Sequence, residues 1–326
     1  MSGKHAVPEK SAGTQKKEGT SNTNPNADIT KVKICSGHTR PICHINYSEI
    51  IDGTFWLVTS CHDAKPMLRN GETGDWVGTF EGHKGAVYCS AFNQGATRLV
   101  TGSGDYSSML WNAITGEKLH TWSHPKYIKS CDWIENKIAT GCFDGLVRIF
   151  DATAYDAEPL SFDSPERANQ VKATYFIDPT TMVTACENVI MKWDLRDTSR
   201  PYLRKEIPGL NFLEYTHRNS IVAAHEKSIS FIDTTTLDIK SSFTTTEDVE
   251  CASLSPNGQN VAAGSRLKAK EFTLDGTELE SHRGHHGPIF HIRWAPDGKS
   301  FTSGAEDGMA RIWPSHEIIE TYDADE

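Results

Sequence analysis

An acidic residue followed six positions later by an aromatic residue recurs along this chain at a nearly constant spacing. The clearest pairs are Asp105 before Trp111, Asp144 before Phe150, Glu187 before Trp193, and Asp307 before Trp313. Extending the same register to positions 63, 226 and 266 gives seven units with a mean spacing of about 41 residues. A period of about 40–45 residues is the length of one four-stranded blade of a β-propeller. The spacing therefore predicts an all-β, seven-bladed propeller.

The residues within a unit agree with four short strands. In the second unit the strand-like segments are residues 86–92, 97–101, 108–111 and 118–122. Turn-forming residues separate them, and the segments 255–258 and 295–298 carry the same Pro-Asx-Gly chemistry at equivalent places. No long helical periodicity interrupts the pattern, so we expect sheet throughout.

The two ends of the repeat array predict how the ring closes. The last unit ends at Trp313 and Pro314, which leaves little room for its fourth strand, while residues 28–35 are strand-like and precede the first unit. We expect this N-terminal strand to complete the last blade, because closure removes exposed sheet edges. The predicted organisation is a disordered polar tail at 1–28, the propeller at 29–314 and an acidic tail at 315–326.

Gly-His dipeptides at 37–38, 82–83 and 284–285, each followed by a turn Asp and an aromatic residue, resemble WD repeats. The resemblance implies that a His, a strand Ser or Thr, the turn Asp and the Trp form a hydrogen-bonded tetrad that locks a blade. Two complete structural tetrads are expected: His83, Thr101, Asp105 and Trp111, and then His285, Ser303, Asp307 and Trp313. The third blade offers His124, Thr140 and Asp144 but has Phe150 in place of Trp, and blades four to six lack the Gly-His.

A closer resemblance is carried by residues 61–76, CHDAKPMLRNGETGDW, and by 82–87, GHKGAV. These residues resemble the family of serine/threonine kinase receptor-associated proteins, also called unr-interacting proteins. Arg69, which stands where a blade normally has Trp, is part of this resemblance. The resemblance implies an interaction scaffold in the SMN complex, which loads Sm rings onto spliceosomal small nuclear RNAs and so serves mRNA splicing and processing. It also implies links to receptor-kinase signalling and to an RNA-binding regulator of translation.

A second family resembles the last blade equally well. Residues 284–289, GHHGPI, are similar to those of the WD-repeat subunit i of translation initiation factor three. The segments 65–69 and 74–76, together with a short sixth blade, favour the first family. The expected partners are therefore SMN- and Gemin-type proteins, with initiation-factor subunits or receptor kinases as alternatives.

Composition bounds the remaining function classes. The net charge is −10 and no run of five basic residues occurs, which disfavours broad capture of nucleic acid, so we expect any contact with RNA to be indirect. The chain has no apolar run of membrane-spanning length, and because its first twenty residues contain no apolar run we expect no secretory signal. Its eight cysteines are scattered without a C-x-x-C pair. We expect a monomeric propeller in the cytoplasm, with the nucleus as a second compartment.

Residues that could support catalysis are sparse. The nucleotide-binding and nucleophile-elbow motifs are absent from the sequence. The histidines 282, 285, 286 and 291 lack a nearby carboxylate or Cys at ligand spacing, so we predict no metal, no cofactor and no catalytic residue. The enzyme alternative would require a deep channel lined by two or more His, Asp or Glu residues that are not engaged in blade hydrogen bonds.

Binding through loop residues is the favoured hypothesis, because a propeller presents a rigid ring of loops. Blade geometry in the resembling family places the residue before each turn Asp, and those after each Gly-His, on one face. The partner-binding candidates so identified are Arg40, His62, Lys84, Phe143, His225, His286 and Glu306, with Lys126 and Tyr127 beside them. Two further candidates stand apart: Trp76 begins an outer strand, and Arg69 could direct a cation at a partner.

Overall fold

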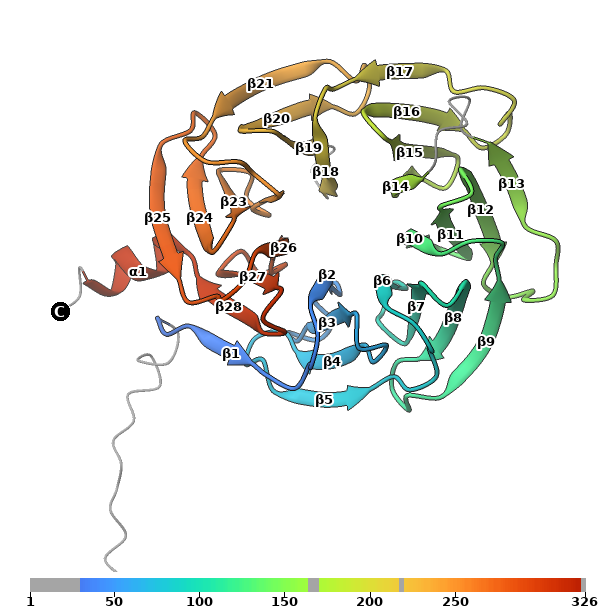
Figure 1. Cartoon of the computed structure of the whole chain (residues 1–326), viewed down its shortest axis with the longest axis horizontal. Coiled ribbons are helices and arrows are strands. Elements are labelled where there is room, and N and C mark those ends of the chain that lie inside the picture. Colours follow the sequence, from blue (N-terminus) through green and yellow to red (C-terminus); the bar gives the residue numbers. More distant parts are fainter. Residues whose placement is uncertain (1–29, 164–169, 217–219, 324–326) are drawn as a thin grey trace, which may run out of the picture.

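The fold is a closed ring of seven antiparallel sheets, as Figure 1 shows in a computed structural model. The structure describes residues 30–163, 170–216 and 220–323, and within these ranges each sheet has four strands. The seven-bladed propeller predicted from the 41-residue period is confirmed. The segment 1–28, expected to be a polar tail, lies outside the described residues.

In each blade the first strand lies at the central axis and the fourth at the rim (Figure 1). Blade one comprises β2 (Ile42–Tyr47), β3 (Trp56–Cys61), β4 (Met67–Asn70) and β5 (Trp76–Thr79). Blade two comprises β6 (Val87–Phe92), β7 (Arg98–Ser103), β8 (Ser107–Asn112) and β9 (Lys118–Ser123). Blade three comprises β10 (Ile128–Ile134), β11 (Lys137–Cys142), β12 (Leu146–Asp151) and β13 (Leu160–Asp163). Blade four comprises β14 (Val171–Asp178), β15 (Thr181–Cys186), β16 (Val189–Asp194) and β17 (Leu203–Glu206).

The remaining blades repeat this order. Blade five comprises β18 (Leu210–Thr216), β19 (Ser220–His225), β20 (Ser228–Asp233) and β21 (Ile239–Thr244). Blade six comprises β22 (Cys251–Leu254), β23 (Asn260–Ser265), β24 (Lys268–Thr273) and β25 (Glu278–Arg283). Blade seven comprises β26 (Ile289–Trp294), β27 (Ser300–Ala305), β28 (Ala310–Pro314) and, as its outer strand, β1 (Lys33–Cys35).

The ring closes through β1. This strand pairs antiparallel with β28, with Lys33 opposite Ile312 and Cys35 opposite Ala310. The predicted closure by an N-terminal strand is therefore confirmed. Because the first strand is hydrogen-bonded to the last repeat, opening the ring requires breaking a sheet rather than a single loop contact.

Close packing between neighbouring blades depends on glycine in the second strand. A Cβ added at Gly102 in β7 would lie 2.5 Å from Ile128 Cγ2 of the next blade, and one added at Gly141 would lie 2.7 Å from Val171 Cγ1. Such distances are far below van der Waals contact, so only a residue without a side chain allows this approach. The β-branched residues that begin the inner strands fill the space instead.

Blades four to six turn differently from the blades that carry a Gly-His. Glu187, Glu226 and Arg266 occupy the register of the turn Asp, yet each adopts a left-handed φ of 48–52° as the first residue of a two-residue hairpin. Positive φ at the first central position is characteristic of tight two-residue hairpins. These three residues mark the repeat, but within the described residues none of them forms the hydrogen bond to a histidine that the turn Asp forms in blades one, two and seven.

The C-terminal segment, expected to be an acidic tail, contains the helix α1 (His316–Asp323). Glu271 of β24 is fully buried, and its Oε2 accepts a hydrogen bond of 2.9 Å from the backbone N–H of His316. The start of α1 is thereby attached to blade six. Within the described residues, no helix combines the length and apolar character needed to cross a membrane.

Candidate interaction face and central channel

The tetrad of blade two is complete. His83 Nδ1 donates to Asp105 Oδ2 at 2.8 Å, and its Nε2 lies 2.7 Å from Thr101 Oγ1. Trp111 Nε1 donates to the same hydroxyl at 2.8 Å. A single histidine tautomer satisfies this order, because Nδ1–H faces the carboxylate and Nε2 accepts the hydroxyl proton. A His–Asp pair that looks catalytic in sequence is here part of the blade.

Blade seven repeats the arrangement. His285 Nδ1 lies 3.0 Å from Asp307 Oδ2, and His285 Nε2 lies 2.7 Å from Ser303 Oγ. Trp313 Nε1 donates to that hydroxyl at 2.7 Å. The imidazoles of both tetrads are buried, which removes them from contact with any ligand on the surface.

The turn aspartates remain ionised in these networks. Burial raises the pKa of Asp105, but hydrogen bonds from His83, Ser107 and the backbone of Lys84 outweigh it, and the net pKa lies below the ordinary value. The pKa of Asp307 is likewise lowered against burial, chiefly by the backbone N–H groups of His286 and Met309. Each carboxylate is held by several donors, so its role is structural.

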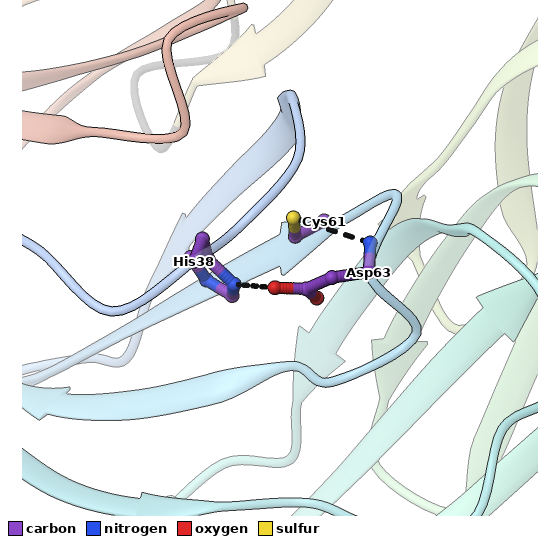
Figure 2. Close-up of side chains that lie close together, drawn as sticks. All are labelled: His38, Cys61 and Asp63. Atoms are coloured by element: carbon purple, nitrogen blue, oxygen red, sulfur yellow. Dashed lines mark hydrogen bonds and ion pairs between the residues drawn. The ribbon is translucent and has the colours of Figure 1, made fainter.

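Blade one brings together His38, Cys61 and Asp63, a set of side chains that could hold a metal ion (Figure 2). His38 Nδ1 lies 2.8 Å from Asp63 Oδ2, and its Nε2 lies 2.8 Å from Thr59 Oγ1. The backbone N–H of Asp63 donates to Cys61 Sγ, as that of Asp105 donates to Ser103 Oγ in blade two.

This cluster is the blade-one counterpart of the tetrad. Burial raises the pKa of the Cys61 thiol well above its ordinary value, whereas a metal would require the thiolate. Both ring nitrogens of His38 are already engaged by Asp63 and Thr59. The donor set therefore does not fit a metal site, and Cys61 occupies the place of Ser103.

Arg69 stands in this blade where the tetrads have Trp, and the expectation that it presents a cation to a partner is wrong. Its side chain is 3% exposed. Nη1 donates to the carbonyl of Gly74 at 3.1 Å, and Nη2 donates to the carbonyl of Ser36. The guanidinium thus connects β4 to the segment that follows the closing strand β1. Because it is buried and hydrogen-bonded within the protein, it is not available to a partner.

Blade three corrects a second expectation, since His124, Thr140 and Asp144 do not form a triad. His124 Nε2 lies 2.9 Å from Ser108 Oγ of the neighbouring blade. Asp144 instead binds Arg148, with an Nη2–Oδ2 distance of 2.7 Å. Phe150 supplies no indole donor, and burial lowers the pKa of His124 to about 4, so the ring offers no positive charge to Asp144.

The other loop candidates surround one face of the ring. The backbone N–H groups of His62, Phe143 and Glu306 donate to carbonyls of Pro41, Tyr127 and Pro288, next to the start of an inner strand. Arg40, Lys84 and His286 lie exposed in the same type of loop. His225 is the last residue of β19 and is half-buried, with Nε2 2.8 Å from Ser230 Oγ.

Trp76 lies elsewhere. It begins the outer strand β5 at the rim, its side chain is 61% exposed, and its Nε1 donates to Thr79 Oγ1 at 3.1 Å. His282 lies on β25 and stacks on Trp313 with ring centroids 4.8 Å apart. Neither residue reaches the loop face.

Aromatic side chains form a continuous strip across the loop face of blades one to three. Ring centroids are 5.4 Å apart for His62 and Tyr88, 5.8 Å for Tyr88 and Tyr127, and 4.3 Å for Tyr127 and Phe143. Lys129 Nζ lies over the Tyr88 ring at 4.3 Å from its centroid. We call these five residues the aromatic strip.

Two members of the aromatic strip, Tyr88 and Lys129, were not among the sequence candidates. Each occupies the second position of an inner strand, β6 or β10, directly beside a buried residue. In a propeller this alternation points one set of side chains along the central channel. The positions of Tyr88 and Lys129 could therefore be recognised from the alternation in the two inner strands. The same alternation of buried and polar residues occurs in most strands, so it did not single them out.

The central channel contains a cavity of about 260 Å³ next to the aromatic strip. Its lining residues come mainly from the first few positions of the inner strands and include Tyr88, Lys129, Lys172, His44 and His291. A smaller cavity of about 70 Å³ lies where the inner strands end, and Glu214 and Arg293 line it.

The titratable groups of the larger cavity are poorly suited to acid–base chemistry. Burial lowers the pKa of His44 to about 3 and that of His291 well below its ordinary value. Burial also raises the pKa of the Cys43 thiol to about 12. A neutral thiol beside an imidazole that does not take up a proton near neutral pH is not an activated nucleophile. The enzyme alternative requires unengaged histidines in a channel, and His44 and His291 line this cavity. Neither is basic enough to take up a proton near neutral pH.

Comparison with known proteins agrees with the blade geometry. The model of the WD domain, G-beta repeat, matches residues 74–112, 116–151 and 276–314. Serine-threonine kinase receptor-associated protein from Gallus gallus is 36% identical over 284 residues, which cover 86% of this chain and 81% of that protein. The protein of that name from Dictyostelium discoideum is 37% identical over 290 residues, covering 86% of this chain and 97% of that protein.

A more distant similarity exists to a second family. Eukaryotic translation initiation factor 3 subunit I from Anopheles gambiae is 28% identical over 317 residues, covering 86% of this chain and 96% of that protein. Both similarities cover 86% of this chain, so the two families differ in their sequence identity to it and not in the region matched.

Proposed function

This chain belongs to the family of serine-threonine kinase receptor-associated proteins, and we propose that it acts as a non-enzymatic scaffold of the SMN complex in spliceosomal small nuclear ribonucleoprotein assembly. The aromatic strip is the observation that carries a binding role for the loop face. Tyr, Phe and a cation on a rigid surface are typical anchors of protein interfaces. We place this activity in the cytoplasm and the nucleus.

The channel chemistry supports the non-enzymatic part of the proposal. The buried histidines and thiols of the larger cavity are held in their neutral forms. The tetrad His–Asp pairs are closed by Thr101, Ser303 and their indoles. A scaffold needs only the rigid loop face, and the closed ring supplies it.

The proposal is tested by affinity purification of the tagged chain from its own cells, followed by mass spectrometry. SMN- and Gemin-type proteins in near-stoichiometric amounts would support it. Initiation-factor subunits would contradict it and favour the second family, whose members are similar along the same length of chain. Kinase receptors without SMN-type proteins would also contradict it.

A variant pair assigns the partner to the loop face. Replacing both Tyr127 and Phe143 with Ala removes the closest ring contact of the aromatic strip. The matched control is Ile114→Ala, which trims an apolar side chain that is 77% exposed in the β8–β9 turn. We expect the double variant to lose the partners and the control to retain them. Equal retention by both would exclude the aromatic strip as the binding surface.

A further inference from the structure

The larger cavity is a positively charged site in an acidic protein. Lys129 of β10 and Lys172 of β14 both line it, and none of its lining residues is Asp or Glu. The whole chain nevertheless carries a net charge of −10. A positively charged cavity attracts negatively charged ligands, even in a protein whose net charge is negative.

Neither lysine has a carboxylate partner among the described residues. Lys172 Nζ donates to the backbone carbonyl of Leu210 at 3.2 Å, which leaves two of its three ammonium protons available. Lys129 Nζ lies over the Tyr88 ring, a contact that leaves its positive charge uncompensated. Cations with unused donors at the wall of a cavity are poised for an anionic group.

A buried polar atom in the wall of the same cavity also lacks a partner. His291 is 3% exposed and lines the cavity, and its Nδ1 has no hydrogen-bond partner within the described part of the chain. Its ring is packed between His44 and Phe212, with centroids 4.5 Å and 4.9 Å away. An unpaired buried polar atom costs free energy, so a polar ligand that reaches the cavity gains by pairing with it.

We infer that this cavity binds the carboxylate of a single acidic side chain, presented by an extended loop or tail of a partner protein. Lys172, which has two ammonium protons free, binds the carboxylate, and Lys129, which lies over the Tyr88 ring, adds positive charge to the cavity wall. The aromatic strip and Phe290, which is 39% exposed, contact the flanking residues. The inference deepens the proposed scaffold function and rests on it, because it names the chemistry that the loop face recognises.

The size and charge of the site favour a protein side chain over RNA. A volume of about 260 Å³ lies below the usual 300–1,000 Å³ of small-molecule pockets and suits one inserted side chain. Binding of RNA gains most of its affinity from many phosphate contacts, whereas only two lysines line this cavity. The surrounding negative charge of the chain would repel a long polyanion but tolerates one carboxylate.

The test uses the full chain and two fluorescein-labelled peptides, Gly-Ser-Phe-Glu-Phe-Ser-Gly and its Gln counterpart, in anisotropy titrations at low and high salt. We expect the Glu peptide to bind about tenfold more tightly at low salt, the effect of one hydrogen-bonded charge. Lys172→Met should remove this preference and leave binding of the Gln peptide unchanged, and Lys129→Met should reduce the preference. Lys118→Met on the outer strand β9 is the matched control and should keep the preference.

Three results would overturn the inference. The first is equal affinity for the two peptides, or no binding of either one. The second is an unchanged preference in both cavity variants while thermal unfolding confirms that they fold. The third is tighter binding of oligouridylate than of the Glu peptide, lost in the same variants. If the Glu peptide binds as expected but no SMN-type protein co-purifies, the proposed assembly role fails and the cavity assignment stands.

Discussion

The carboxylate of Asp144 is bound by the guanidinium of Arg148 at 2.7 Å, and the buried histidine of the same blade, His124, turns to a different partner. In blade two the corresponding carboxylate, Asp105, binds His83. Asp105 and Asp144 occupy the same position of the repeat but have different structural roles. Asp105 is the centre of a buried network, and Asp144 is one half of a local ion pair.

The two aspartates should respond differently to the same substitution. Asp105→Asn leaves an amide where His83, Ser107 and Lys84 donate to the carboxylate, and we expect a loss of about 3 kcal/mol in the free energy of unfolding. Asp144→Asn breaks one partly buried ion pair but keeps an oxygen for the backbone N–H of Leu146, and should cost less, about 1.5 kcal/mol. Urea denaturation of both variants measures the difference, and equal losses would contradict the distinction.

Stability should fall as pH rises through the range set by Glu214. This residue is 2% exposed, and burial raises its pKa to about 7 against the opposing effect of Arg293, 3.7 Å away. Because the folded protein then binds more protons than the unfolded chain between pH ~4.5 and ~7, the free energy of unfolding decreases with pH across that window.

Replacing Glu214 with Gln isolates this contribution. The wild type should lose roughly 2–3 kcal/mol relative to Glu214→Gln between pH ~4.5 and ~7, at about 1.4 kcal/mol per pKa unit. Urea denaturation at a series of pH values gives the two profiles. Parallel profiles would show that Glu214 titrates as an exposed carboxyl and would refute the prediction.

Arg69 should stabilise ring closure. In Arg69→Met the carbonyls of Ser36 and Gly74 lose a buried donor, and we expect a cost of about 2–3 kcal/mol in the free energy of unfolding. Hydrogen exchange of the β1 amides should accelerate more than that of β7. The matched control is Lys65→Met, which removes an exposed ion pair with Glu81 and should change stability by less than about 1 kcal/mol.

The sequence predicted those features that a single repeat determines. The turn acid, the Gly-His and the aromatic residue lie in one blade at fixed offsets, so the repeat pattern alone places His83 and Trp111 in the same tetrad. The β1 closure followed from a missing strand. These features depend on local register, which a period of about 41 residues makes visible.

The features that sequence reasoning missed depend on contacts between blades or on competition for a partner. Arg69 carries a charge and was expected outside, but its guanidinium finds two carbonyls that no repeat pattern encodes. Tyr88 and Lys129 belong to different blades and meet only because their inner strands are neighbours. Asp144 was expected beside His124, but Arg148, which the repeat pattern does not single out, binds its carboxylate instead.

The attachment of α1 gives the last prediction. Glu271 accepts hydrogen bonds from Asn260 Nδ2 at 2.8 Å and from the backbone N–H of His316 at 2.9 Å, both within a buried site. In Glu271→Gln the side chain keeps one acceptor oxygen, and its amide donor then faces one of these donors. The free N–H groups at the start of a helix need an acceptor, so α1 should detach while the propeller remains folded.

Hydrogen exchange monitored by mass spectrometry distinguishes detachment from general unfolding. The amides of 316–323 should lose protection in Glu271→Gln, whereas those of β23, on the same blade, should change little. Glu317→Gln, an exposed carboxylate in the first turn of α1, is the control and should alter protection only slightly. If α1 keeps its protection in the Glu271 variant, the hydrogen bond to Glu271 is not what holds the helix, and the prediction is wrong.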